Sequence, residues 1–278
     1  MIAGRIGIVG GAGQLGAAIG AALIDAGAVA PGRLWISSRS GRAAAFAGRD
    51  GVTVTADNAA LARACDTILL AVPPAAAGAI GIAAPDRLVI SVMAGIGLNR
   101  IAALTGAARV VRAMSSPAAA RRLAYSPWVA APAVTARDRA VVAAIFGACG
   151  LTDEIADEGW IDHFTALTGP VPGFVALFAE EMIRHATGQG IAPDIAERAV
   201  RQLFRGAGEI LAAEPDPPAA HVAAMVAYAG TTAAGIAAMR QAGLGAAIAA
   251  GLAAAAERAA GFGRDRSAAA DRGRDSGP

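Results

Sequence analysis

Three glycines near the amino end have the spacing of a dinucleotide-binding turn. Gly11, Gly13 and Gly16 lie in GGAGQLG, between the apolar run 5–9 and a stretch of helical composition, 17–26. In such a G-x-G-x-x-G motif the glycines make a tight turn, let the backbone approach a pyrophosphate, and allow the helix to pack closely on the strand. The helix start then presents free N–H groups to the phosphates. Since 35 glycines also produce this motif by chance, the neighbouring elements decide its meaning.

Those neighbouring elements alternate between strand and helix. Apolar runs at 5–9, 33–37, 52–55, 67–72 and 87–92 are mostly separated by alanine-rich stretches and by turns at proline or glycine. Such alternation predicts a parallel sheet covered on both faces. From about residue 157 the chain becomes helical, with segments at 174–185, 193–214, 221–239 and 243–260. We therefore predict a dinucleotide-binding α/β domain over 1–156, a helical substrate and dimerisation domain over 157–262, and a disordered tail over 263–278.

The end of the second predicted strand indicates which dinucleotide is bound. A site for NAD usually has Asp or Glu there for the ribose hydroxyls, whereas this chain has SSRS at residues 37–40. The planar guanidinium of Arg39 can pair with a phosphate, and serine hydroxyls add donors. This pattern favours NADP(H), although an ordinary surface loop with one arginine would look the same.

Composition excludes several other kinds of chemistry. All 24 basic residues are arginine, so Schiff-base and lysine-base mechanisms are excluded, and the net charge of +2 favours no nucleic-acid partner. The three histidines have no metal-ligand spacing, so no metal site is predicted. Cys65 and Cys149 are predicted to be buried thiols in a reduced cytoplasm. We identify no targeting segment, and we expect a cytoplasmic protein.

In HVAAMVAYAGTTAAGIAAMR at 221–240, the eighteen residues between His221 and Arg240 carry no charge, and the stretch is long enough to cross a bilayer. A membrane span would not account for Gly230, Thr231 and Thr232 in its middle. We predict instead a break between two helices at YAGTT, where Gly230 lets the chain turn and Thr231 caps the second helix. The apolar flanks would then lie in the core of a homodimer or higher homo-oligomer, and no membrane partner is expected.

Ordered motifs over nearly the whole chain apart from the tail resemble those of the pyrroline-5-carboxylate reductase family. They are IGIVGGAGQLG, SSRS, the pair Asp57 and Asn58, DTILLAVPP, VISVMAGI, VVRAM, DHFTALTGPVPGF and AGTTAAG. The resemblance implies a Rossmann domain followed by an all-helical dimerisation domain. It also implies an oxidoreductase of proline biosynthesis that reduces a cyclic imine with NADPH, either 1-pyrroline-5-carboxylate to L-proline or a close variant with another substrate.

The resemblance assigns roles to residues at the ends of these motifs. The cofactor would be bound by Gly11, Ala12, Gly13, Gln14, Leu15, Gly16, Ser38, Arg39, Ser40, Asn58, Ala71, Val72 and Pro73, with Ala94 and Gly95 near the nicotinamide. The substrate would contact Met114, Gly169, Val171 and Gly230. Thr232 would hydrogen-bond the ring nitrogen, with Thr231 and Thr168 as further catalytic residues. An iminium carbon is already electrophilic, so alignment and one hydroxyl are enough for the chemistry.

Departures from the family pattern leave alternatives open. The family usually has lysine at Pro74, a Pro-Asn pair at Ser115 and Ser116, and SGSGPA in place of TGPVPG, where Pro170 and Val171 change the expected cradle for a carboxylate. An imine reductase acting on another imine, with Asp162 as proton donor, is one alternative; Asp162 would otherwise be a solvated first-turn residue. A catalytically silent nucleotide-binding protein of the same fold is another. A beta-hydroxyacid dehydrogenase is disfavoured, because it needs a lysine.

Overall fold

The computed structural model describes residues 1–272, with side chains described as far as Phe262. The chain forms two compact units, one comprising Met1–Pro170 with the chain from Leu252, the other Val171–Gly251. The helix Trp160–Thr168 (α5) belongs to the first unit. The predicted domain boundary at residue 157 lies where the alternation of strands and helices ends, and it stays a prediction.

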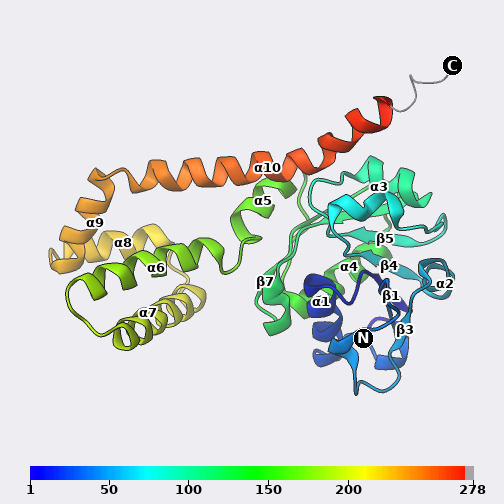
Figure 1. The fold of residues 1–278 in the computed structure, drawn as a ribbon, viewed down its shortest axis with the longest axis horizontal. Coiled ribbons are helices and arrows are strands. Elements are labelled where there is room, and N and C mark those ends of the chain that lie inside the picture. The colour runs from blue at the N-terminus through cyan, green and yellow to red at the C-terminus, as the bar shows by residue number, and fades with distance from the viewer. Residues whose placement is uncertain (273–278) are drawn as a thin grey trace. The chain divides into compact units, whose positions relative to one another are not determined.

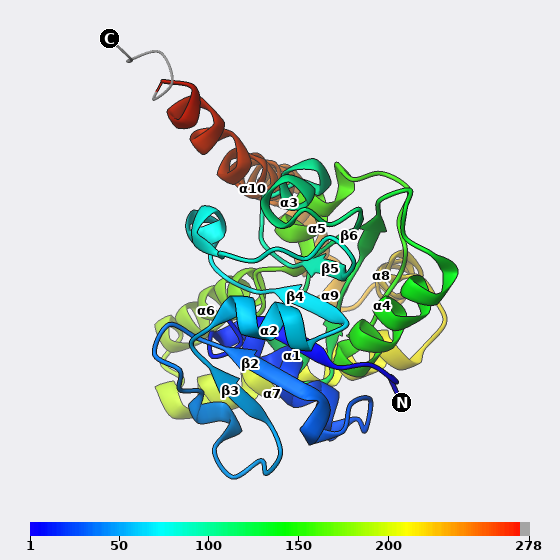
Figure 2. The ribbon, with the colours of Figure 1, turned by 90° about the vertical axis from the view of Figure 1, so that its right-hand side faces the viewer.

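The first unit is built on a mainly parallel sheet of the order β3-β2-β1-β4-β5-β6-β8. The five predicted runs each contain one strand: β1 (Ile6–Val9), β2 (Leu34–Ser37), β3 (Thr53–Thr55), β4 (Thr67–Leu70) and β5 (Leu88–Ser91). In Figure 2 the labelled strands follow one another in this order from β3 to β6. The order 3-2-1-4-5-6 is that of the Rossmann fold, which confirms the predicted fold class.

Two strands extend this sheet beyond the predicted set. β6 (Arg109–Ala113) continues it in parallel, and β8 (Trp128–Ala130) pairs with β6 antiparallel. The short strands β7 (Ala124–Tyr125) and β9 (Gly150–Leu151) pair separately. β6 carries Arg109 and Arg112 among its five residues, whereas none of the other parallel strands contains a charged residue.

Helices cover both faces of the sheet, as side chains alternate along each strand. On one face Ile6 and Ile8 pack with residues of α1 (Gln14–Asp25) and α4 (Ala136–Cys149). On the other face Val9 and Ile68 pack with residues of α2 (Asn58–Ala64) and α3 (Leu98–Thr105). These two buried apolar layers fix the strand ends from which the candidate site is built.

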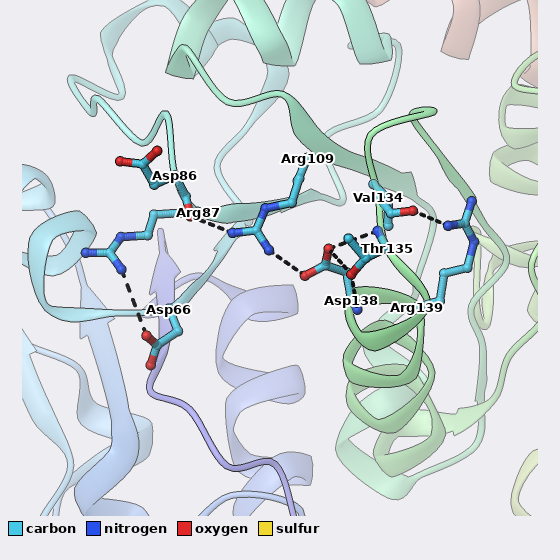
Figure 3. Close-up of polar contacts among 8 residues, drawn as sticks. All are labelled: Asp66, Asp86, Arg87, Arg109, Val134, Thr135, Asp138 and Arg139. Atoms are coloured by element: carbon cyan, nitrogen blue, oxygen red, sulfur yellow. Dashed lines mark hydrogen bonds and ion pairs between the residues drawn. The ribbon is translucent and has the colours of Figure 1, made fainter.

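Polar contacts connect residues at the amino-terminal ends of the strands with one another and with α4, as Figure 3 shows. Arg109, at the start of β6, donates to Asp138 of α4 at 2.7 Å and to the carbonyl of Asp86. Asp138 also forms a capping box with Thr135, which starts α4. Burial alone would raise the pKa of Asp138, but the Thr135 hydrogen bonds and the nearby Arg109 charge outweigh it and lower that pKa.

The second unit consists of helices: α6 (Gly173–Gly188), α7 (Pro193–Ala213), α8 (Pro218–Ala227), α9 (Thr231–Gln241) and the start of α10 (Leu244–Arg272). α6 packs against α7, where the rings of Phe178 and Phe204 lie 6.1 Å apart, edge to face. Within this unit, all of whose residues are described, only Ala196 and Val200 are buried. Figure 1 shows α6 to α9 in green to orange.

The predicted break at YAGTT is present, but its backbone geometry and its cap differ from the prediction. α8 and α9 are bent by 117° at this point. Gly230 is the N-cap of α9, Thr231 is its first helical residue, and no side chain caps the helix. The left-handed backbone that makes the turn falls on Ala229, whose φ is 55°. The predicted cap by Thr231 is therefore wrong, because Thr231 already has helical backbone geometry.

One helical segment, Trp160–Gly188, is long and apolar enough to be a membrane span. The α8–α9 pair would be a second one only if the two bent helices formed a single span. The first segment includes the interruption between α5 and α6, and a core helix of a protein outside the membrane passes the same test. α10 continues to Arg272, into the segment predicted as a disordered tail; residues 273–278 lie outside the described residues.

Candidate functional site

The glycine-rich turn after β1 is shaped by Gly10, which the predicted motif did not include. Gly10 has a φ of +79°, and a Cβ there would lie 2.8 Å from the carbonyl oxygen of Ala71. Gly11 lies within the same turn but has no positive φ, so the left-handed backbone conformation falls on Gly10. A Cβ on Gly11 would instead lie 2.9 Å from the Ile36 side chain. The extra glycine, directly before the motif, was the available signal for the turn.

Gly16 has the close packing that the motif predicts. A Cβ at this position would lie 2.7 Å from the carbonyl oxygen of Gly10 and 2.8 Å from the Cα of Gly11. These are backbone atoms, which cannot move aside easily. Gly13 is the N-cap of α1 and has no side chain, so the first N–H groups of α1 stay open to a ligand.

A cavity of about 870 Å³ lies beside this turn, at the carboxyl ends of β1, β2 and β4. The predicted cofactor residues that line it are Ala12, Gly13, Ser38, Arg39, Ser40, Asn58, Ala71, Val72 and Pro73. The others, Gly11, Gln14, Leu15, Gly16, Ala94 and Gly95, do not line it. Gly10 and Ser37, which adjoin the predicted residues, also line it, and prediction missed Val9, Ala56, Ala76, Ala79 and Ile80, whose small or apolar side chains have no distinctive signal.

Ser38 builds the loop that presents Arg39. Its hydroxyl donates to the carbonyl of Arg42 at 2.7 Å and accepts from the N–H of Arg42 at 3.1 Å. Arg39 and Ser40 are exposed in the turn that this hydroxyl closes, and Arg39 makes no ion pair within the described part of the chain. No Asp or Glu is among the described residues that line the cavity. The cavity therefore suits a ribose carrying a phosphate.

Asn58 connects two walls of the cavity. It accepts a 2.6 Å hydrogen bond from the buried Ser37 hydroxyl and donates at 2.7 Å to the carbonyl of Ile80. Ile80 follows the short 3₁₀ helix Pro74–Ala79 (η3), which contributes the alanine wall. Asn58 keeps one amide hydrogen that these two bonds do not use, so it can both hold the wall and face a ligand.

Three of the predicted catalytic and substrate residues in the first unit lie together. The Thr168 hydroxyl, at the end of α5, donates to the carbonyl of Phe164 at 3.1 Å and lies 3.9 Å from the sulfur of Met114. Gly169 follows directly, and a Cβ there would lie 2.3 Å from the carbonyl oxygen of Thr165. Ala94 and Gly95 follow β5 in a separate loop, where Gly95 has a φ of +70°.

The remaining predicted residues lie in the second unit. Gly230, Thr231 and Thr232 form the corner between α8 and α9, and both threonines are exposed. No side chain caps α9, and the Ala233 N–H donates to the carbonyl of Gly230 at 3.1 Å, so the N–H groups of Thr231 and Thr232 are the ones available to a ligand. Val171 is exposed and precedes Pro172. This corner therefore offers hydroxyl and N–H donors to a small polar ligand.

Asp162 has neither of the environments considered for it from the sequence. It accepts from the buried guanidinium of Arg112 at 2.5 Å, and its side chain is only 19% exposed. It is therefore neither a solvated residue of the first turn nor a group free to serve as proton donor.

The thiols and histidines offer no further chemistry. Cys65 and Cys149 are buried, and burial raises the pKa of each thiol to about 12. Their nucleophilic thiolate forms are therefore suppressed near neutral pH. Among the residues that the structure describes, no group of three His, Cys, Asp or Glu side chains could hold a metal ion.

The sheet order, the glycine turn and the cavity together define a dinucleotide-binding oxidoreductase of the Rossmann class with an added helical unit. Residues 5–95 match the family described as NADP oxidoreductase, coenzyme F420-dependent, and residues 158–262 match the family described as pyrroline-5-carboxylate reductase dimerisation. Along most of its length the chain is therefore similar to pyrroline-5-carboxylate reductases.

Individual relatives agree over most of the chain. A pyrroline-5-carboxylate reductase from Synechocystis is 29% identical over 242 residues, which cover 85% of this chain and 90% of that one. The solved structure of such a reductase from Coxiella burnetii is 26% identical, with a TM-score of 0.85 and coverage of 94% and 99%. A Plasmodium falciparum reductase with NADP bound is 24% identical, with a TM-score of 0.81 and coverage of 95% and 99%, and it supports the fold alone.

Proposed function

We propose that this protein uses NADPH to reduce the C=N bond of a cyclic imine, converting 1-pyrroline-5-carboxylate to L-proline. The observation that carries the proposal is a Rossmann cavity lined by Arg39 and by no carboxylate among the described residues, in a chain similar to pyrroline-5-carboxylate reductases. When bound, NADPH supplies a hydride to the imine carbon. The ring nitrogen takes a proton, so imine, NADPH and one proton give amine and NADP⁺.

The cofactor is proposed to lie along the glycine turn and the cavity. Gly13 and the start of α1, including Gln14 and Leu15, present N–H groups to the pyrophosphate. Arg39 and Ser40 bind the ribose phosphate, and Ala71, Val72 and Pro73 line the path towards the nicotinamide. Ala94 and Gly95 complete the nicotinamide end, as the family resemblance implies.

The proton and the substrate are proposed to be handled by hydroxyl groups. Thr232 hydrogen-bonds the ring nitrogen, and Thr231 and Thr168 assist it. Met114, Gly169, Val171 and Gly230 contact the substrate. A threonine is sufficient because the electrophile is already activated as an iminium ion, so binding and alignment supply most of the catalysis. This role requires no metal ion and no lysine.

The segment after α5 favours a second candidate, reduction of an imine without a carboxylate. Pro170 has no backbone N–H, and the Cβ of Val171 blocks the close approach that glycine would permit. Pro170 thus removes a donor that a carboxylate could use, and Val171 hinders the approach to its own N–H. The same hydride transfer would then reduce a cyclic imine that carries no carboxylate.

Matched pairs of cyclic imines test both candidates. Purified protein is mixed with NADPH and with 1-pyrroline-5-carboxylate or 1-pyrroline, which differ only in the carboxylate, and NADPH absorbance is followed. We expect faster turnover of the carboxylate-bearing imine. Preference for 1-pyrroline would support the second candidate. No turnover of any imine in a panel, together with normal NADPH binding, would identify a silent nucleotide-binding protein.

The helical unit is proposed to join two copies of the chain into a homodimer. Large apolar side chains are exposed there, including Leu177, Leu203 and Ile248, each more than half exposed. Such exposure is typical of a subunit interface. The cytoplasm is the proposed location, which suits two free thiols. The small-molecule imine is the proposed substrate, with no nucleic-acid or membrane partner.

A further inference from the structure

A buried arginine, Arg112, links β6 to α5 inside the first unit. Its side chain is only 5% exposed, and its guanidinium donates to Asp162 at 2.5 Å and to Glu158 at 3.4 Å. Removing a charged group from water is costly unless its partners compensate for the lost hydration. The two acidic partners compensate for it at the two terminal nitrogens, whereas the buried Nε has no hydrogen-bond partner among the described residues. The hydride-transfer chemistry itself makes no use of these three residues.

Glu158 also caps a helix from a distance. α3 begins at Leu98, and its N-cap Gly97 has no side chain that could accept a hydrogen bond. The Oε1 atom of Glu158, 60 residues further along the chain, accepts the Leu98 N–H at 2.8 Å. A Cβ at residue 97 would lie 3.1 Å from that oxygen, so glycine leaves room for it. One carboxylate therefore joins α3 to Arg112.

An apolar layer joins the same three elements. Met114 after β6 and Ile161 of α5 are buried in one cluster, against which Leu98 of α3 and Phe164 of α5 are packed. Ion pairs next to such a layer are less screened by water and therefore more rigid. We call Arg112, Glu158 and Asp162, with this layer, the clamp.

The clamp connects two segments that are proposed to face the two reactants, NADPH and the imine. The loop that leads from β5 into α3 carries Ala94 and Gly95, which are proposed to face the nicotinamide. α5 leads to Thr168 and Gly169, which are proposed to face the imine. Fixing α3 against α5 thus fixes these two pairs of residues against each other, within a single unit.

We propose that Arg112 and Glu158 are positioning residues that set the distance and angle for hydride transfer. The inference rests on the proposed function. Neither residue contacts a reacting atom in this scheme. Hydride transfer is sensitive to alignment, so that a displacement of about 1 Å can cost roughly 10²-fold in rate. Losing one contact of the clamp should therefore slow the chemical step while leaving the NADPH cavity intact.

Glu158→Ala and Glu158→Gln test the proposal, because loss of Arg112 would leave both Glu158 and the largely covered Asp162 without their cation and could prevent folding. Glutamine keeps an oxygen for the Leu98 N–H but not the charge. Glu154→Ala is the matched control, since Glu154 pairs with Arg139 at 2.9 Å and has a similar exposure, 38% against 36%. We expect E158A to lower kcat at least about tenfold, E158Q to lower it less, and both to keep the NADPH Kd within about twofold.

Two further readouts separate positioning from a general loss of stability. The primary isotope effect with 4-deuterated NADPH should rise in E158A, as hydride transfer becomes rate-limiting, and amide exchange in residues 93–105 should accelerate. E154A should change neither. Wild-type kcat in E158A, or an equal loss in E154A, would overturn the clamp alone. Absence of imine turnover by the wild-type protein would contradict the proposed function and, with it, this role.

Discussion

Arg39 is the residue from which we expect cofactor selectivity. Replacement by serine should raise the KM for NADPH by about 10- to 100-fold, because charge-assisted hydrogen bonds contribute roughly 1.5–3 kcal/mol. The KM for NADH, which has no 2′-phosphate, should change little. Steady-state kinetics with both cofactors check this.

Arg42→Ser is the control for Arg39, since it alters the same loop. The side chain of Arg42 does not line the cavity, and Ser38 contacts only its backbone. Equal losses with NADPH and NADH in Arg39→Ser, or an equal effect of Arg42→Ser, would contradict the selectivity assigned to Arg39.

Thr232 is the residue to which we assign the hydrogen bond to the ring nitrogen. Thr232→Ala should lower kcat by about 10²-fold, the lower end for a positioned proton-transfer group, and Thr232→Ser should restore most of it. NADPH binding, measured by fluorescence, should be unchanged. Thr231→Ala is the neighbouring control, and we expect a smaller loss. If T231A were the more damaging change, the two roles would have to be exchanged.

At the scale of elements, the capping box of α4 is predicted to stabilise the first unit in a pH-dependent way. Asp138→Asn should lower the free energy of unfolding by about 1–3 kcal/mol at pH 7, since it weakens a cap and leaves Arg109 without its charged partner. Urea unfolding measures this. Asp194→Asn, which affects an ion pair whose aspartate is 72% exposed, should have an effect below about 0.5 kcal/mol.

The sign of the pH dependence follows from the lowered pKa of Asp138. A carboxyl group whose pKa is lower in the folded state stabilises the protein above its unfolded pKa, about 3.9. That contribution is lost as the pH falls from this value through the folded pKa. The difference between wild type and D138N should thus be constant above about pH 5 and shrink on acidification. A difference that grew below pH 4 would contradict the assignment.

The strands and helices show what the sequence could and could not predict. Uncharged runs of apolar and β-branched residues located β1 to β5, because strands covered on both faces rarely contain charged residues. β6 escaped prediction because Arg112 interrupts its run, and the acids that compensate this charge lie about 50 residues away along the chain. The same kind of long-range contact gives α3 its cap from Glu158. The family resemblance, by contrast, predicted nine of the sixteen residues that line the cavity, and only Ala12 and Gly13 among these belong to the glycine motif.

At the scale of the whole molecule, the exposed apolar surface of the helical unit predicts self-association. Light scattering after size exclusion should give at least twice the mass of one chain at micromolar concentration. The physical reason is the cost of leaving many apolar side chains in water, about 25 cal/mol for each Å². A monomer that persists at 100 µM and remains folded would contradict the proposed homodimer.

The central claim is that this chain reduces a cyclic imine with NADPH, and its most direct test is the stoichiometry of one reaction. Purified protein is incubated with 1-pyrroline-5-carboxylate and limiting NADPH, and proline is quantified by amino-acid analysis while NADPH absorbance is followed. The account predicts one proline formed for each NADPH oxidised, with the rate reduced in Thr232→Ala. NADPH that binds but is not oxidised, with no proline formed, would contradict it.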